Sequence, residues 1–299
     1  MTLTGLSAFP LTPLTSAGDV DEAAFAGLVD RLAAAEVDSI SPLGSTGSYA
    51  YLHRDERARV ARLAVEHAAG VPVIVGIGAL RTRDVLAHAE DAQSAGASAV
   101  LLAPMSYQPL TPDDVFGLYE DVTRELSVPL VVYDNPGTTR FTFTDDLYRA
   151  VAALPGVSSI KIPGVPATPG EATAHVDGLR RLLPEHVTLG VSGDVFGATG
   201  LNAGCDAWYS VIGGTLPETT SVITRAARSG DAAGAIEASD RLRPLWDLFA
   251  EHGSLRVVAV IAEHLGLVST PSLPTPIRGL SGEDRAKVVG VVEELELRA

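Results

Sequence analysis

Short apolar runs alternate with amphipathic stretches along most of this chain, and this alternation constrains the fold more than any other feature. Continuous apolar strands separated by helices are typical of a parallel sheet covered on its faces. The predicted strands are Leu3–Pro10, Ser39–Leu43, Val71–Gly76, Ala99–Pro104, Pro129–Tyr133, Val157–Ile162, Val187–Val191 and Ala207–Val211. Eight such units favour a closed (β/α)8 TIM barrel of the α/β class over an open sheet.

The segments between these strands carry the spacing of helices. The predicted helices are Asp21–Ala35, Asp55–Ala69, Thr82–Ala95, one beginning near Pro112, Thr144–Leu154, Ala172–Leu183 and Phe196–Asn202. Beyond Thr215 the pattern changes to helices only. We therefore expect a barrel carrying the active site over residues 1–214 and a C-terminal helical region packed on it over residues 215–299.

Charge and composition narrow the classes of function. The formal net charge is −15, which argues against a nucleic-acid or anionic-membrane surface, since both need clustered basic residues. A single cysteine, Cys205, excludes an internal disulfide framework. No signal peptide is recognisable at Met1–Gly5, and no apolar run is long enough to span a bilayer. We expect a soluble, cytoplasmic protein.

Lys161 stands out because it lies between two isoleucines in the sixth predicted strand. It is one of only two lysines among the 22 basic residues, so the chain uses arginine for ordinary surface charge. Loss of hydration lowers the pKa of a buried ammonium from about 10.4 towards about 7–8, where the neutral amine is a nucleophile. The alternative is a lysine that extends to water or pairs with a carboxylate.

Other reactive or binding side chains follow the remaining predicted strands at their carboxyl ends, where TIM barrels carry their chemistry. The loop after the second strand contains Ser45, Thr46 and Gly47, Tyr107 follows the fourth strand, Tyr133 ends the fifth, Gly193 follows the seventh and Tyr209 lies in the eighth. A nucleophilic amine, a phenol and a neutral anion-binding loop on one face indicate carbonyl chemistry through a Schiff base with a 2-oxo acid.

Two other interpretations keep the barrel but change the chemistry. The first is a phosphate-binding enzyme without imine chemistry, because Gly213-Gly214-Thr215 follows the eighth strand, where many barrels hold a phosphate. The second is a non-catalytic barrel that binds a 2-oxo acid without turnover. Metal-dependent chemistry is disfavoured, because none of the seven histidines falls at a predicted strand end and no pair has the spacing of a zinc site.

Four motifs resemble the dihydrodipicolinate synthase / N-acetylneuraminate lyase family of class I aldolases. They are Gly44-Ser45-Thr46-Gly47, Tyr133-Asp134-Asn135-Pro136, Ile160-Lys161 and Ser192-Gly193-Asp194, in the family's order and spacing. The resemblance covers nearly the whole chain. It implies a (β/α)8 barrel with a C-terminal helical region, a homotetramer built as a dimer of dimers, and neither a metal nor an organic cofactor.

The resemblance also implies roles for single residues. Lys161 would form the imine with pyruvate or another 2-oxo acid, Tyr133 would relay protons, and Ser45 and Thr46 would hold the carboxylate. Tyr107 matches a tyrosine that in the synthases reaches into the neighbouring subunit's site. The expected catalytic residues are thus Lys161, Tyr133, Thr46 and Tyr107, and the expected binding residues are Ser45, Thr46, Gly47, Thr138, Arg140, Gly193 and Tyr209.

Two departures from the family pattern leave the second substrate open. Ser48 stands where the loop usually continues with glutamate, and Thr138 stands where the lysine-biosynthetic synthases have an arginine that binds a carboxylate. Arg140 is a candidate replacement for that arginine. We therefore expect a lyase, an aldolase or a dehydratase, acting on a 2-oxo acid such as a sugar-acid derivative. The alternative within the family is 4-hydroxy-tetrahydrodipicolinate synthase activity, the condensation of pyruvate with aspartate semialdehyde.

Overall fold

Eight parallel strands form the centre of the protein, whose structure is a computed structural model describing residues 2–298. The strands are β1 (Gly5–Ala8), β2 (Ser39–Ile40), β3 (Ile74–Gly76), β4 (Ala99–Leu102), β5 (Leu130–Tyr133), β6 (Val157–Ile162), β7 (Thr188–Ser192) and β8 (Ala207–Ser210). Their order in the sheet is β2-β1-β8-β7-β6-β5-β4-β3. A parallel bridge between Ile40 and Val73 joins the two outer strands, so the sheet curls into the predicted TIM barrel.

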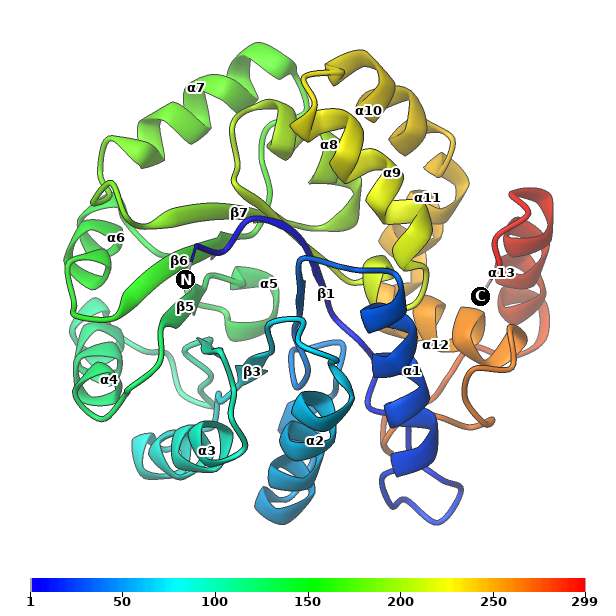
Figure 1. The fold of residues 1–299 in the computed structure, drawn as a ribbon, viewed down its shortest axis with the longest axis horizontal. Coiled ribbons are helices and arrows are strands. Elements are labelled where there is room, and N and C mark those ends of the chain that lie inside the picture. The colour runs from blue at the N-terminus through cyan, green and yellow to red at the C-terminus, as the bar shows by residue number, and fades with distance from the viewer. Residues whose placement is uncertain (1, 299) are drawn as a thin grey trace.

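Helices follow the strands and surround the barrel, as Figure 1 shows. They are α1 (Glu22–Ala34), α2 (Arg54–His67), α3 (Thr82–Ser94), α4 (Pro112–Arg124), α6 (Asp145–Ala152), α7 (Pro169–Arg180) and α8 (Gly197–Asn202). The start of α4 shows why these segments are helical: the Thr111 hydroxyl accepts the Asp114 N–H at 3.2 Å, and the Asp114 carboxylate accepts the Thr111 N–H at 2.8 Å. Pro112 occupies the first turn, where its missing N–H costs nothing.

Alternate residues of each strand face opposite sides, and this separates two cores. Inside the barrel, Leu101 of β4 and Val131 and Tyr133 of β5 pack with Phe9 and Tyr209. The intervening residues point outward and pack under the helices in a much larger core. The same alternation places Ser159 and Lys161 of β6 on the inner side, because they pair in register with Val131 and Tyr133.

The structure differs from the predicted elements where the chain turns. β2 and β3 are shorter than the predicted strands Ser39–Leu43 and Val71–Gly76. Pro42, which lies beyond the observed end of β2, has no N–H to donate to a neighbouring strand. Its carbonyl accepts the Gly76 N–H at 3.0 Å. A one-turn helix, α5 (Pro136–Thr139), and three short turns, η1 (Tyr49–Tyr51), η2 (Asp194–Phe196) and η3 (Ile212–Gly214), were not predicted. They are too short for a helical period to show in the sequence.

The C-terminal helical region is present, as predicted. It consists of α9 (Pro217–Arg228), α10 (Ala232–Asp240), α11 (Arg243–His252), α12 (Ser254–His264) and α13 (Gly282–Glu294). The first of these helices, α9, packs on β1 and covers the barrel, and the following helices share its hydrophobic core. The division into two parts at residue 214 remains a prediction, since the core runs across it.

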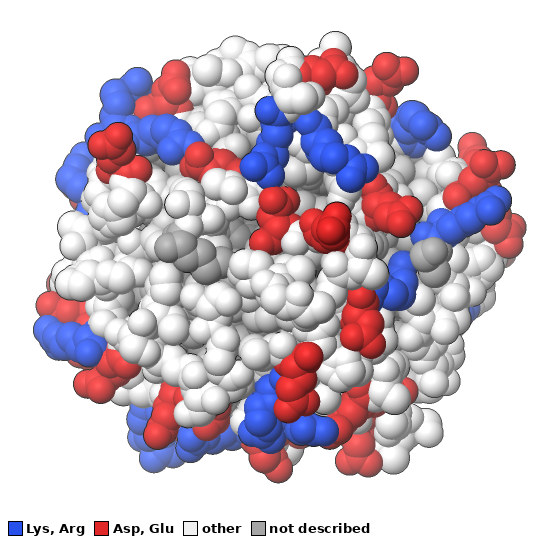
Figure 2. Space-filling view, viewed as in Figure 1, with Lys and Arg blue, Asp and Glu red and all other residues white. Residues whose placement is uncertain are grey.

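Two surface properties bear on the expected partners. None of the helices within residues 2–298 is long and apolar enough to cross a membrane. On the face drawn in Figure 2, acidic and basic side chains are interspersed, and the basic ones do not merge into a broad patch.

Candidate active site

Lys161 lies inside the barrel near the carboxyl end of β6. Its partners in register are Tyr133 of β5 and Gly190 of β7. The side chain is only 3% exposed, and its Nζ lies 3.9 Å from the centroid of the Phe9 ring and 4.2 Å from that of Tyr133. The amine therefore faces aromatic rings at the mouth of the barrel and does not extend to solvent.

Burial lowers the pKa of Lys161 to about 7, and the charge of Asp194 opposes this shift. Within residues 2–298, no carboxylate forms an ion pair with Nζ. The ammonium form is therefore stabilised by the faces of the surrounding rings and, without a direct ion pair, by the charge of Asp194. Both alternatives for this lysine, extension to water and pairing with a carboxylate, disagree with the structure.

Two glycines make room for the rings around the amine. A Cβ on Gly190 would lie 2.2 Å from Cε2 of Tyr209, and a Cβ on Gly44 would lie 2.5 Å from Cδ1 of Phe9. Distances this short are steric clashes, so any larger residue would displace these rings. Tyr209 is further fixed by a 2.8 Å hydrogen bond between its hydroxyl and Ser159.

Tyr133 lies beside the amine, and its hydroxyl group belongs to a network of polar side chains. Its phenol oxygen accepts a hydrogen bond from Asn135 Nδ2 at 2.8 Å and lies 3.5 Å from Ser45 Oγ. Asn135 also donates to Thr138 Oγ1 at 2.9 Å. Burial raises the pKa of Tyr133 to about 12, so the phenol keeps its proton at neutral pH. A protonated phenol beside a nucleophilic amine can give and take a proton during carbonyl chemistry.

Asp134, the residue between Tyr133 and Asn135, points away from this network. Its Oδ2 accepts the Tyr148 hydroxyl at 2.5 Å, and its N–H donates to the Lys161 carbonyl at 3.0 Å. Burial raises the pKa of Asp134 to about 6. Asp134 thus connects β5 to α6 and to β6, and it does not line the site.

The loop after β2 supplies donors beside Tyr133. Within residues 2–298, the N–H groups of Ser45 and Thr46 have no hydrogen-bond partner. Gly47 is held close to the preceding turn, because a Cβ there would lie 2.9 Å from the Leu43 nitrogen. Free N–H and hydroxyl donors in a tight loop are suited to an anion such as a carboxylate.

Asp194, directly after Gly193, organises the end of β8. Its buried carboxylate accepts hydrogen bonds from the Ser210 hydroxyl at 2.8 Å and from the N–H groups of Val211 and Ile212 at 3.2 and 2.9 Å. Burial raises the pKa of this carboxyl group, and these three donors oppose the shift. Asp194 therefore fixes the loop that borders the site on the side of β7 and β8.

The phosphate-binding interpretation fails in this loop. The N–H groups of Gly213, Gly214 and Thr215 donate to Ser210 Oγ, the Val211 carbonyl and the Ile212 carbonyl. A Cβ on Gly214 would lie 2.0 Å from the Phe9 carbonyl oxygen, so this glycine is needed for packing. All three residues are buried, and their donors are not available to a phosphate.

A cavity of about 480 Å³ opens above Lys161, and most of the predicted residues line it. Those that do are Ser45, Thr46, Tyr133, Thr138, Lys161, Gly193 and Tyr209. Gly47, Tyr107 and Arg140 do not. Arg140 follows α5 in the left-handed conformation and is exposed, so within one chain it does not take the place of an arginine at position 138. Tyr107 is 89% exposed, and a role for it stays a prediction that requires a neighbouring subunit.

Several lining residues were not in the predicted site. Phe9 lies beside the amine and Asn135 beside the phenol, and Asn135 could have been found from its place two residues after Tyr133 in the motif. Gly253, Ser254, Leu255 and Ile277 come from the C-terminal helical region. No local pattern in the sequence indicates that these residues reach the barrel mouth.

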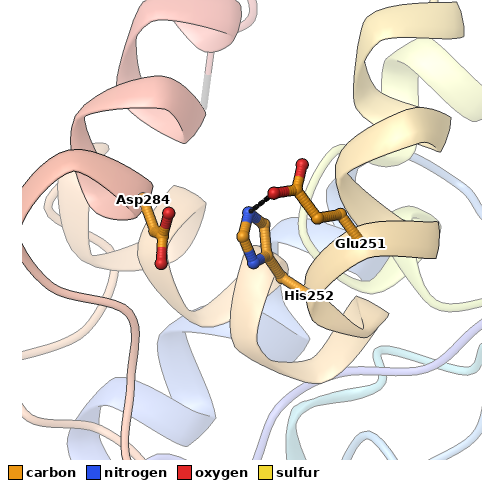
Figure 3. Close-up of side chains that lie close together, drawn as sticks. All are labelled: Glu251, His252 and Asp284. Carbon is orange, nitrogen blue, oxygen red and sulfur yellow. Dashed lines mark ion pairs between the residues drawn. The ribbon is translucent and has the colours of Figure 1, made fainter.

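Potential metal ligands gather elsewhere. Among the described residues, one group of three qualifies: Glu251 and His252 of α11 with Asp284 of α13, drawn in Figure 3. The Lys287 ammonium lies 3.8 Å from the Glu251 carboxylate and 3.6 Å from that of Asp284. This group is therefore an ion-pair cluster with its own cation, and none of its members lines the cavity above Lys161.

A second cavity, of about 520 Å³, opens where the strands begin. Its charged lining includes Arg180 and Asp206, which pair with each other at 2.6 Å. Asp206 also accepts the Leu189 N–H at 2.8 Å. Arg180 and Asp206 are therefore hydrogen-bonded within the protein. They lie at the amino end of the barrel, where side chains contribute to stability more than to chemistry.

Comparisons with known proteins agree with this geometry. The family model described as Dihydrodipicolinate synthetase family matches residues 2–295. A 4-hydroxy-tetrahydrodipicolinate synthase of Phenylobacterium zucineum is 31% identical over 284 residues, which are 94% of this chain and 93% of that protein. One from Agrobacterium fabrum is 32% identical over 79% of each chain. The crystal structure of a dihydrodipicolinate synthase from Agrobacterium tumefaciens has a TM-score of 0.93, with 43% identity and 98% of each chain covered.

Proposed function

Because the chain belongs to the dihydrodipicolinate synthetase family, we propose that Lys161 forms a Schiff base with pyruvate or another 2-oxo acid and that the protein acts as an aldolase or dehydratase. The observation that carries this proposal is the buried Lys161 amine with a pKa of about 7, 4.2 Å from the Tyr133 ring. An amine that is half neutral near pH 7 attacks a ketone carbon readily.

The proposed reaction begins with attack of Lys161 Nζ on the ketone carbon. The C–N bond forms, the ketone oxygen takes one proton from the Tyr133 phenol and a second that the amine nitrogen loses, and it leaves as water when the C=N bond forms. The protonated imine then withdraws electrons from the neighbouring carbon, which loses a proton to the Tyr133 phenolate to give an enamine. Ser45, 3.5 Å from the phenol oxygen, donates a hydrogen bond to the Tyr133 phenolate between these steps.

Carboxylate binding is assigned to the loop after β2. Ser45, Thr46 and Tyr133 all line the cavity, and Ser45 Oγ lies 3.5 Å from the Tyr133 phenol oxygen. A carboxylate there accepts charge-assisted hydrogen bonds and directs its ketone carbon towards Lys161. The imine itself provides the electron sink, so the proposed reaction needs neither a metal nor an organic cofactor.

Borohydride reduction in the presence of pyruvate tests this proposal directly. We expect an irreversible adduct on the peptide that contains Lys161, identified by mass spectrometry, and its loss in Lys161→Ala. Lys287→Ala is the matched control, because it removes the only other lysine, which lies in the ion-pair cluster. An unmodified Lys161 peptide after reduction would contradict the imine.

A second candidate is the condensation of pyruvate with aspartate semialdehyde. It is favoured by relatives such as that of Phenylobacterium zucineum, which are named 4-hydroxy-tetrahydrodipicolinate synthase. Assay of the purified protein with both substrates, following consumption of the semialdehyde, distinguishes this activity from other aldolase or dehydratase reactions. The lining of the cavity, considered below, argues against it.

The proposal extends to assembly and location. We propose a cytoplasmic homotetramer in which Tyr107 of one subunit approaches the site of its neighbour. The 89% exposure of Tyr107 supports this, since an aromatic side chain this exposed is well placed for an interface. Light scattering on wild type and Tyr107→Trp would test it, with a monomer as the contradicting result.

A further inference from the structure

The cavity above Lys161 is larger than pyruvate requires. Its volume of about 480 Å³ lies in the range of pockets that hold ligands of drug size. The imine end is bounded by Phe9, Tyr133 and Tyr209. The remaining space is bounded by other residues, and their character determines what the imine or enamine can react with.

The outer half of the cavity offers no positive charge. Among the lining side chains of residues 2–298, Lys161 is the one cation, and it is used by the imine. Position 138 carries a threonine whose hydroxyl accepts a hydrogen bond from Asn135, and Arg140 does not line the cavity. A second carboxylate bound here would lose water without gaining a cationic partner, which is strongly unfavourable.

Part of the cavity lining is apolar. Leu255 and Ile277 of the C-terminal region line the cavity together with Met105 and Val211 of the barrel loops, and all four side chains are only partly buried. The turn between α11 and α12 brings Leu255 to this place through Gly253, whose φ of 80° is one that other residues rarely adopt. An apolar group bound in the cavity would remove these side chains from water.

We propose that the second reactant is an uncharged aldehyde with an apolar chain or ring, selected by Leu255 and Ile277 and by the absence of a cation at position 138. This rests on the proposed imine at Lys161. The enamine carbon forms one C–C bond with the aldehyde carbon, and the aldehyde oxygen takes a proton from Tyr133. The proton lost from the pyruvate methyl group balances the one gained, and water releases a 4-hydroxy-2-oxo acid from the lysine.

Three aldehydes of nearly equal size provide the test: 4-methylpentanal, 4-oxobutanamide and 4-oxobutanoate. They end in an isopropyl group, an amide and a carboxylate. With pyruvate as the donor, we expect kcat/KM for 4-methylpentanal to exceed that for 4-oxobutanoate by at least tenfold, with the amide between them. Preference for the carboxylate, or turnover of none of the three by an enzyme that still forms the pyruvate adduct, would overturn the inference.

Variants at position 138 isolate the role of charge. Thr138→Arg should raise kcat/KM for 4-oxobutanoate relative to 4-methylpentanal by tenfold or more, because a guanidinium binds a carboxylate. Thr138→Gln is the matched control: it also loses the bond from Asn135 but adds no charge, so its ratio should stay near that of wild type. An equal change of the ratio in both variants would show that charge is not the determinant.

Leu255→Ala and Ile277→Ala test the apolar part of the lining. Each should lower kcat/KM for 4-methylpentanal several-fold and leave that for 4-oxobutanamide nearly unchanged, and equal losses for both aldehydes would overturn the role of these apolar side chains. Borohydride trapping with pyruvate is run on every variant. If the wild-type protein forms no adduct, the proposed function itself is refuted. If the adduct forms but the carboxylate aldehyde is preferred, only this inference is refuted.

Discussion

Tyr133 and Lys161 are paired in register on neighbouring parallel strands, and the Lys161 amine lies 4.2 Å from the centre of the Tyr133 ring. Both side chains point into the barrel at the carboxyl ends of β5 and β6. The backbone of the same strands continues the connection, since the Lys161 carbonyl accepts the Asp134 N–H. The nucleophile and the proton donor are therefore held together by sheet geometry, with no flexible loop between them.

The first prediction concerns pH. The pKa of Lys161 is about 7 in the folded protein, and only the neutral amine attacks a ketone. We expect kcat/KM for pyruvate to fall as the pH drops below 7, approaching tenfold per unit of pH. The pH dependence of adduct formation measures this, and a rate that stays constant down to pH 5 would be incompatible with it.

The second prediction concerns the stability of Lys161→Met. In the unfolded chain the pKa is near 10.5, so folding must bury the charge or remove the proton. Replacement by methionine should raise the free energy of unfolding by roughly 2–4 kcal/mol at pH 7. The gain should be largest below pH 7 and shrink between pH 7 and 10.5, as the unfolded lysine also loses its proton. Urea unfolding at several pH values measures it, and a loss of stability at pH 7 would contradict the burial cost.

The third prediction concerns Asp194. Its negative charge raises the pKa of Lys161, so Asp194→Asn should move the acidic limb of the pH–rate profile to lower pH. Asp194→Ala should also lower the free energy of unfolding by about 2–4 kcal/mol, because the Ser210 hydroxyl and two N–H groups lose their acceptor. A profile that does not move in Asp194→Asn would show that the two charges do not interact.

The fourth prediction concerns Tyr133→Phe. Removal of the phenol hydroxyl eliminates the proposed proton donor, and kcat should fall by about 10²–10⁴-fold. The ring face remains beside Lys161, so the pKa seen in adduct formation should change little. Thermal unfolding serves as the control for folding. Retention of wild-type kcat would exclude Tyr133 as the relay.

The fifth prediction concerns Gly190. A methyl group there would meet the Tyr209 ring at 2.2 Å, so Gly190→Ala should destabilise the protein by about 1–3 kcal/mol and impair adduct formation. Gly178→Ala is the matched control, because its Cβ would meet only an arginine side chain at 3.9 Å within α7. That change should be neutral or stabilising by up to about 1 kcal/mol. Equal stability of the two variants, measured by urea unfolding, would contradict the close approach of Tyr209.

The sequence predicted the barrel because its signal is periodic and repeated. Each strand is a short apolar run and each helix has an apolar face. Eight such strand–helix units favour a closed barrel over an open sheet. Lys161 was predictable because it lies between Ile160 and Ile162, so its side chain points to the face of the strand opposite these two apolar residues, which is either the barrel interior or the face under the helices. Strand alternation could not decide between these, and the register with Tyr133 did.

The sequence by itself determined the eightfold barrel, the lysine at the end of the sixth strand and the hydroxyl loop after the second, because these depend on neighbours along the chain. Only the tertiary structure decided that Phe9 covers the amine, that Asp194 holds the loop after β8, and that Leu255 and Ile277 form the outer wall. Those contacts join segments far apart in sequence. Their position depends on how helices pack around the closed barrel, which no local pattern of residues encodes.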